Sequence, residues 1–131
     1  MEFGKVILYV ADVEASLAFY DQAFDLKTRF IRDAGYGEVQ AGGTTLSFAS
    51  FAAGQRHLPP GLRCAPPSPT DVSMEIALVS EAVDDAFARA VGAGATPLRQ
   101  PELQPWGQTS SYLRAPDGTV IDLSSPPPAW G

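Results

Sequence analysis

The hydrophobic and polar positions follow two different periods in the first fifty residues. Segment 4–10 alternates and is rich in Val and Ile, which predicts a strand. Apolar residues then recur every three or four positions, which predicts a helix that begins after an N-cap at Asp12 and runs to about residue 24. The stripe consists of Val13, Leu17, Tyr20 and Phe24. Further strands are predicted over about 26–32, 36–41 and 44–50, so this part is expected to be βαβββ.

Prolines dominate the next stretch. Between about 51 and 70 the chain has few apolar residues and five prolines: Pro59, Pro60, Pro66, Pro67 and Pro69. This composition predicts an extended connector.

The same pattern then returns. A strand is predicted over about 72–79, a helix over about 81–92, and further strands over about 96–100, 108–115 and 118–124. Ile76 lies 70 positions after Val6, and Ile121 lies 75 positions after Leu46, in matching places of the two patterns. We therefore predict one domain over 1–131 with module 1 at about 1–50, the connector at about 51–70 and module 2 at about 71–125.

Charge and composition exclude several classes of protein. The 15 acidic residues outnumber the nine basic ones, for a net charge of -6, and the basic residues are dispersed, so a nucleic-acid partner is not expected. The longest apolar runs are far shorter than the roughly 20 residues of a membrane span. No secretory signal pattern opens the chain, so we expect a cytoplasmic protein without a membrane partner. The single cysteine, Cys64, can form neither an intrachain disulfide nor a thiolate zinc site.

Three segments carry a resemblance to a known family, and one of them, Glu75 through Ala93, looks like the second strand and helix of that family's fold. Residues 105–123 read Pro-Trp-Gly-Gln-Thr-Ser-Ser-Tyr-Leu-Arg-Ala-Pro-Asp-Gly-Thr-Val-Ile-Asp-Leu, and residues 10–20 read Val-Ala-Asp-Val-Glu-Ala-Ser-Leu-Ala-Phe-Tyr. They resemble the closing hairpin and the first strand and helix of the glyoxalase/bleomycin resistance protein/dioxygenase superfamily, also called the vicinal oxygen chelate fold. The resemblance implies an α+β fold in which two tandem βαβββ modules form a curled mixed sheet around a cleft, and it implies a homodimer.

In the metalloenzymes of that superfamily four side chains hold a divalent ion in the cleft. The resemblance places Lys5, Ser47, Glu75 and Asp122 at those positions, and strand alternation independently turns Lys5, Ile7 and Tyr9 away from the helix. A lysine would repel the ion and a serine is a weak ligand, so only Glu75 and Asp122 remain as metal ligands and no cofactor is expected. We hypothesise that the Lys5 ammonium replaces the metal between these two acids; the alternative is that Lys5 points into solvent.

Further residues are candidates for the wall of the pocket. Trp106, Gln108 and Tyr112 share one face of a predicted strand, where an aromatic surface stacks on planar ligands, although Trp106 is equally typical of a core or dimer interface. Tyr36 and Phe30 are candidates from the first module. The lone His57 has no residue spacing typical of a catalytic triad.

Three functions follow from these residues. The first is metal-independent binding of a small organic molecule, planar or hydrophobic, of the bleomycin-resistance type and without turnover. The second is a divalent-metal-dependent lyase, isomerase or dioxygenase that uses Glu75 and Asp122. The third is a metal-free enzyme in which Lys5 or an acid transfers a proton at a perturbed pKa.

Overall fold

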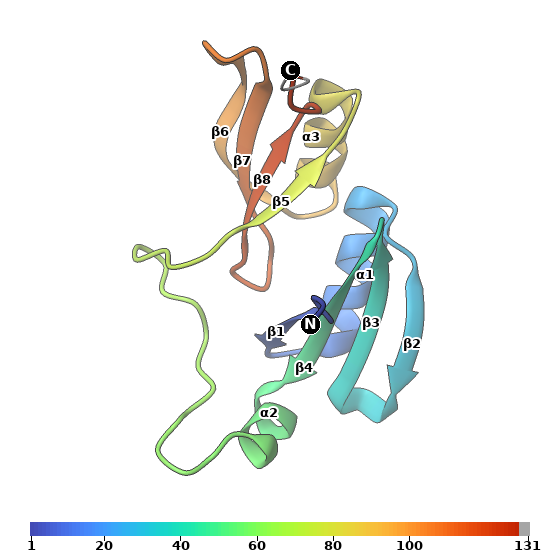
Figure 1. Ribbon diagram of the computed structural model, residues 1–131, viewed down its shortest axis with the longest axis vertical. Coiled ribbons are helices and arrows are strands. Elements are labelled where there is room, and N and C mark those ends of the chain that lie inside the picture. Colours follow the sequence, from blue (N-terminus) through green and yellow to red (C-terminus); the bar gives the residue numbers. More distant parts are fainter. Residues whose placement is uncertain (129–131) are drawn as a thin grey trace. The chain divides into compact units, whose positions relative to one another are not determined.

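The computed structural model describes residues 1–128, and the chain divides between Pro66 and Pro67 into two compact units. The first unit begins with a strand and a helix and continues with three strands and a second helix (Figure 1). Its elements are β1 (Val6–Val10), α1 (Val13–Phe24), β2 (Thr28–Arg32), β3 (Tyr36–Ala41), β4 (Thr44–Ser50) and α2 (Phe51–His57). A 3-10 turn, Asp33–Gly35, joins β2 to β3.

Four strands of this unit make one mixed sheet in the order β1-β4-β3-β2, with β1 parallel to β4. Helix α1 begins where the Asp12 side chain accepts a hydrogen bond from the Ala15 N–H at 3.0 Å, as the predicted N-cap requires. The apolar stripe of α1 packs on one face of the sheet, against β3 and β4. Leu8 and Val10 point to that side and are buried, whereas Ile7, the residue before Leu8, is 42% exposed. The predicted alternation along β1 is therefore confirmed.

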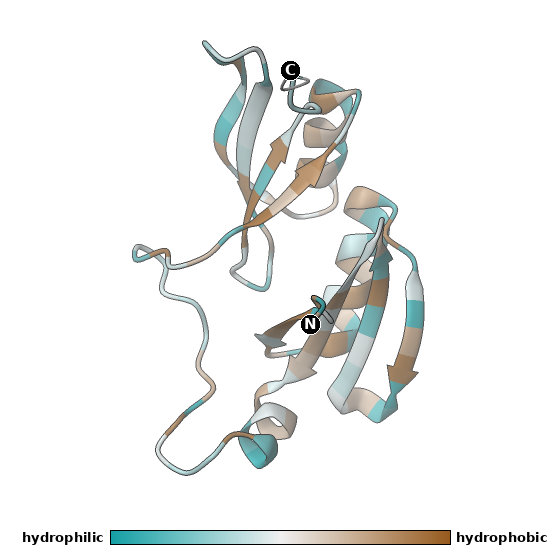
Figure 2. Cartoon of the chain, in the orientation of Figure 1, coloured by the Kyte–Doolittle hydropathy of each residue, from teal (hydrophilic) through white to brown (hydrophobic). Residues whose placement is uncertain are grey.

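The second unit repeats this arrangement. Its elements are β5 (Ile76–Val79), α3 (Val83–Gly92), β6 (Thr96–Leu103), β7 (Thr109–Arg114) and β8 (Val120–Ser124). They form a sheet in the order β5-β8-β7-β6, with β5 parallel to β8. In Figure 2 the hydrophobic residues of this unit are concentrated on β5, β8 and α3.

The pairing of strands confirms the two tandem modules. Val6 pairs with Leu46 in the first sheet, and Ile76 pairs with Ile121 in the second. These are the residues that the sequence placed in matching positions, so the equivalence extends from the sequence to the register of the parallel strands.

The connector differs from the prediction at its start. Residues 51–57 form helix α2, because Ser50 acts as an N-cap and its Oγ accepts a hydrogen bond from the Ala53 N–H at 3.1 Å. The Gln55 side chain then bonds the Leu62 carbonyl and the Cys64 N–H, at 2.7 and 3.0 Å, and ties the following loop to the helix. Only the part of the connector after residue 57 lacks a helix or strand.

Two strands of the second unit differ in length from the prediction. Strand β6 runs to Leu103, three residues beyond the predicted end, and β5 begins at Ile76 rather than at 72. Within residues 1–128 no helix is both long and apolar enough to cross a membrane.

Candidate functional site

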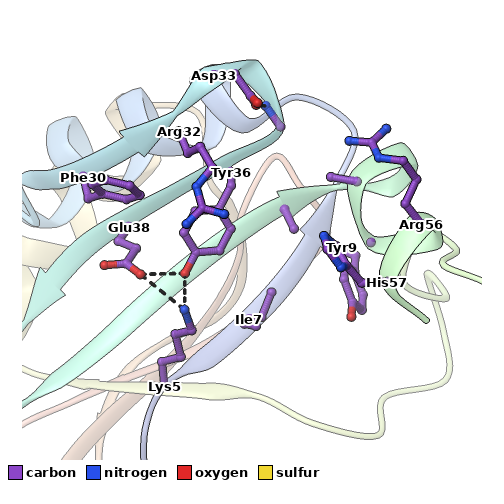
Figure 3. Close-up of a pocket in the computed structure, with 14 residues that line it drawn as sticks. Lys5, Ile7, Tyr9, Phe30, Arg32, Asp33, Tyr36, Glu38, Arg56 and His57 are labelled. Carbon is purple, nitrogen blue, oxygen red and sulfur yellow. Dashed lines mark hydrogen bonds and ion pairs between the residues drawn. The ribbon is translucent and has the colours of Figure 1, made fainter. Parts of the chain in front are cut away.

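A hollow of about 410 Å³ opens on the face of the first sheet that α1 does not cover. Its wall is built from β1, β2, β3, β4, the turn before β3, and α2, all within the first unit (Figure 3). Strand alternation explains which side chains reach it. Ile7 and Tyr9 of β1 line the hollow, while their neighbours Leu8 and Val10 are buried on the side of α1.

A hydrogen-bonded cluster closes one side of the hollow, as the dashed lines in Figure 3 show. The Lys5 ammonium donates to the Tyr36 hydroxyl at 2.5 Å and lies 3.4 Å from Glu38 Oε2. The Tyr36 hydroxyl donates to the same Glu38 oxygen at 2.6 Å. Beneath it lies Ser47, fully buried, whose Oγ is 3.1 Å from the tyrosine oxygen. These four side chains come from β3, from β4 and from the residue just before β1, so the cluster joins three strands.

The carboxylate of the cluster, Glu38, has a strongly lowered pKa. Its second oxygen, Oε1, accepts a hydrogen bond from Arg29 at 2.8 Å. The pKa of Glu38 is lowered from 4.5 to about 2, chiefly by the Arg29 hydrogen bond, then by Tyr36 and by Lys5, against a smaller opposing effect of burial. The pKa of Lys5 is raised, above all by its hydrogen bond to Tyr36. Lys5 and Glu38 therefore both stay charged at neutral pH.

Close packing between β1 and α2 closes another side of the hollow. The ring of Tyr9 rests on the backbone of Gly54, and a Cβ at that position would lie 2.5 Å from Tyr9 Cε1 and 2.8 Å from Cys64 Sγ. Gly54 is buried although α2 is short and mostly exposed. The glycine thus lets the helix approach the tyrosine and sets the position of the ring.

The predicted site residues of the first module lie at or under this hollow. Lys5, Phe30 and Tyr36 line it, and Ser47 supports Tyr36 from below. Of the two orientations considered for Lys5, neither describes it fully: its side chain is 40% exposed, but its ammonium is bound by Tyr36 and Glu38. Its pairing with Glu75 and Asp122, which belong to the other unit, stays a prediction.

Three predicted site residues of the second module, Glu75, Tyr112 and Asp122, lie on its sheet or directly before it. Tyr112 on β7 lies directly opposite Asp122 on β8. The pKa of Tyr112 is raised, first by burial and then by the negative charges of Glu75 and Asp122, and Arg99 opposes this. The charges of both carboxylates therefore act on the phenol, and Asp122 also accepts a hydrogen bond from Ser124 Oγ.

Trp106 precedes β7 in a turn and is 52% exposed within its unit. Its indole N–H donates to Gln108 Oε1 at 2.8 Å, and Gln108 in turn donates to the Ser125 carbonyl at 2.8 Å. This chain of bonds fixes the indole at the entrance of the strand. The role of Trp106 and Gln108 in binding a ligand stays a prediction.

The four positions that the resemblance implies for a metal do not suit one. Lys5 is a cation, and Ser47 offers a neutral hydroxyl that is already hydrogen-bonded to Tyr36. Divalent ions need several carboxylate, imidazole or thiolate ligands. Among residues 1–128 no group of three or more such side chains comes together. The donor set of this chain therefore does not fit the metal of the metalloenzymes.

Sequence reasoning overlooked four charged residues of this wall, Arg32, Asp33, Glu38 and Arg56. Glu38 shares the face of Tyr36, and Arg32 shares the face of Phe30, so strand alternation could have found both. Arg56 lies on α2, and no signal was available for it without that helix. His57, for which we expected no triad, also lines the hollow.

Comparison with known proteins gives a family match and structural neighbours. The sequence profile of the "Glyoxalase/Bleomycin resistance protein/Dioxygenase superfamily" matches residues 2–123. A glyoxalase-related enzyme from Fulvimarina pelagi is 25% identical, with a TM-score of 0.80 over 100% of this chain and 91% of that one. No protein with a curated functional description matches the chain.

Two further solved structures support the fold alone. A glyoxalase/bleomycin resistance protein/dioxygenase family enzyme from Burkholderia phytofirmans PsJN is 20% identical, with a TM-score of 0.71 over 95% of this chain and 98% of that one. A lactoylglutathione lyase from Agrobacterium tumefaciens is 20% identical, with a TM-score of 0.68 over 95% and 92% of the two chains. At this identity the neighbours indicate architecture and not activity.

Proposed function

The chain belongs to the glyoxalase/bleomycin resistance protein/dioxygenase superfamily, and from this premise we propose that it binds a small planar or hydrophobic organic molecule without a metal ion. The observation that carries the proposal is the hollow on the first sheet, which combines apolar and aromatic walls with the cluster of Lys5, Tyr36 and Glu38, whose polar groups bind one another. Small-molecule sites are typically concave and mostly apolar, with a few fixed polar groups.

The apolar part of the wall supports a flat ligand. Ile7 and Phe30 are each 42% exposed. Phe30 and Tyr36 stand edge to face with ring centroids 6.3 Å apart. Stacking of a planar molecule on exposed aromatic faces of this kind stabilises the complex.

The charged cluster supports binding in preference to proton transfer. A general base works best when its pKa lies near the working pH. The pKa of Glu38 near 2 makes this carboxylate a weak base, and the raised pKa of Lys5 keeps the amine protonated. In this arrangement the cluster holds its charges fixed, which suits a binding wall.

A pair of neighbouring substitutions tests the proposal. Ala53 lines the hollow from α2, whereas Ala52 beside it is exposed and does not. Wild type, Ala53→Phe and Ala52→Phe are titrated with the neutral fluorescent probe N-phenyl-1-naphthylamine. We expect binding to wild type and to Ala52→Phe, and about tenfold weaker binding to Ala53→Phe because its ring occupies the hollow.

Two results would contradict this proposal. Equal affinities of the three proteins would show that the probe binds elsewhere. The absence of binding by any of them, with folding verified by circular dichroism, would remove the case for a hydrophobic ligand.

A divalent-metal-dependent lyase, isomerase or dioxygenase is the second candidate. The observation that favours it is the pair of carboxylates, Glu75 and Asp122, whose charges both raise the pKa of Tyr112, with Asp122 directly opposite Tyr112 in the paired strands. Metal content of the purified protein and its melting temperature with Mn²⁺, Fe²⁺, Ni²⁺ or Zn²⁺ separate the candidates. Stoichiometric metal and a clear rise in melting temperature would favour this enzyme, since a ligand of the native state alone stabilises it. Neither is expected under metal-independent binding.

We also propose that the protein is a cytoplasmic homodimer. Exposed apolar side chains that do not line the hollow, such as Ile31 in the first unit and Val79 in the second, support burial against another surface. Sedimentation velocity measures the assembly state, and a monomer at micromolar concentration would contradict the proposal. Cell fractionation tests the location.

A further inference from the structure

The charges around the hollow run against those of the whole chain. The protein has a net charge of -6, with nine basic and 15 acidic residues. Yet the hollow is lined by three permanent cations, Lys5, Arg32 and Arg56, and by only two carboxylates, Asp33 and Glu38. A site of reversed sign in an acidic protein attracts and orients anions locally.

Both carboxylates are already engaged. Glu38 binds Arg29 through one oxygen, and Tyr36 and Lys5 through the other. Asp33 Oδ1 accepts the Gly35 N–H at 2.6 Å and so holds the turn before β3. Glu38 compensates Lys5 within the cluster, and the surplus positive charge falls on the two arginines.

Neither arginine is neutralised by an acid. Within residues 1–128, Arg32 and Arg56 form no ion pair with a carboxylate, although both are exposed at the hollow. In Figure 3 they reach the hollow from different elements, Arg32 from β2 and Arg56 from α2. Guanidinium groups present a rigid fork of donors that matches carboxylate, sulfonate and phosphate groups.

Arg32 also lies beside the aromatic wall. Its guanidinium carbon is 5.9 Å from the ring centroid of Phe30 and 6.0 Å from that of Tyr36. Cation–π contact of this kind holds an arginine over an aromatic surface while its N–H groups stay available. A binding surface for a ring and a donor for an anion therefore stand side by side.

We infer that the ligand of this hollow is an aromatic anion, whose ring lies against Phe30 and Tyr36 and whose acidic group is bound by Arg32, with Arg56 adding to the attraction. The inference rests on the proposed small-molecule function and adds the charge of the ligand. Carboxylates, sulfonates and phosphate monoesters all carry the negatively charged oxygens that the arginines recognise.

Two probes that differ only by an anionic group test it. The full chain is titrated with 1-anilinonaphthalene-8-sulfonate and with N-phenyl-1-naphthylamine, which lacks the sulfonate. We expect the anionic probe to bind about tenfold more tightly, because its sulfonate gains charge-assisted hydrogen bonds from a guanidinium group that the neutral probe lacks. In Arg32→Gln with Arg56→Gln this ratio should fall to about one, with the neutral probe little affected.

Matched variants guard against a general effect of charge. Arg63→Gln removes an exposed arginine of the same unit that does not line the hollow, and it should keep the wild-type ratio. Arg32→Lys keeps the charge but loses the fork, so it should restore part of the preference. Displacement of the probes by 1-naphthoate and by 1-naphthyl phosphate shows which acidic group is preferred. The neutral 1-naphthamide should displace both probes less strongly than these two anions.

The outcomes separate this inference from the proposed function. If the neutral probe binds in the hollow and the sulfonate brings no gain in wild type, the ligand is not an anion while the binding function stands. If the preference for the anionic probe survives in the double variant, or if it falls equally in Arg63→Gln, then Arg32 and Arg56 do not recognise the anionic group. If neither probe binds to the folded protein, both proposals fail.

Discussion

The ring of Tyr9 packs directly on the backbone of Gly54, in a gap that no other amino acid would leave. A Cβ at residue 54 would come within 2.6 Å of two ring carbons of Tyr9. Strand β1 and helix α2 are thereby held at the distance that shapes the hollow.

Gly54→Ala should consequently destabilise the protein and weaken probe binding. Overpacking of this kind costs about 1–3 kcal/mol, which exceeds the modest helix-propensity gain of alanine. Gly92→Ala, at the end of α3, is the matched control because a Cβ there meets nothing within 4 Å. Urea denaturation of both variants measures the difference. Equal stabilities would show that Tyr9 shifts without cost.

Glu38→Gln should lower stability at neutral pH but not in strong acid. The folded pKa of Glu38, about 2, lies below its ordinary value of 4.5, so ionised Glu38 stabilises the fold fully above about pH 4.5. This contribution is lost as the pH falls toward 2. With its side chain 14% exposed, we expect about 1–2 kcal/mol at pH 7 after screening by solvent.

Free energies of unfolding of wild type and Glu38→Gln between pH 7 and 2 test this expectation. A difference that stays constant over the whole range would contradict it. Carbon-13 NMR titration of the Glu38 carboxyl provides an independent value of its pKa.

Lys5 should be coupled energetically to Glu38. In a double-mutant cycle with Lys5→Met and Glu38→Gln we expect a coupling free energy of about 0.2–1 kcal/mol, because the lysine side chain is 40% exposed. The same cycle with Glu75→Gln tests the hypothesis that Lys5 replaces a metal beside Glu75. Coupling to Glu75 but not to Glu38 would favour that hypothesis over the contact in the first unit.

Tyr112 should ionise at a higher pH than an ordinary tyrosine. Burial and the charges of Glu75 and Asp122 raise its pKa, whereas Arg99 lowers it. Asp122→Asn should therefore lower the pKa of Tyr112, and Arg99→Gln should raise it further. Absorbance at alkaline pH, with Tyr112→Phe used to assign the signal, measures both shifts. Shifts of the same sign in the two variants would show that charge does not govern this phenol.

Much of the fold could be predicted because it depends on local patterns. The alternation along β1 and the stripe of α1 are set by the periods of strand and helix, and Asp12 marks the start of that helix by its own side chain. The matching positions of Val6 and Ile76 predicted the repeat, which the pairing of the strands confirmed. The family resemblance required only local segments of this kind, together with the closing hairpin over residues 105–123.

Helix α2 was not predicted, because the prolines of residues 59–69 indicated an extended connector and residues 51–58 were included in it. The segment itself has an N-cap at Ser50 and no proline before Pro59. A seven-residue helix has little intrinsic stability, so packing of Tyr9 on Gly54 is needed to hold it. Arg56 joins the hollow only as a consequence of that packing.

By itself, the sequence determined the two modules, their strands and main helices, and the orientation of Lys5, Ile7 and Tyr9 away from α1. Only the tertiary structure decided that Lys5 binds Tyr36 and Glu38, and that Arg32 lies over an aromatic wall. The physical reason is the range of the interactions. Side-chain direction along a strand is fixed by its own backbone, whereas the partner of a charged group depends on which distant strands pair and in what register.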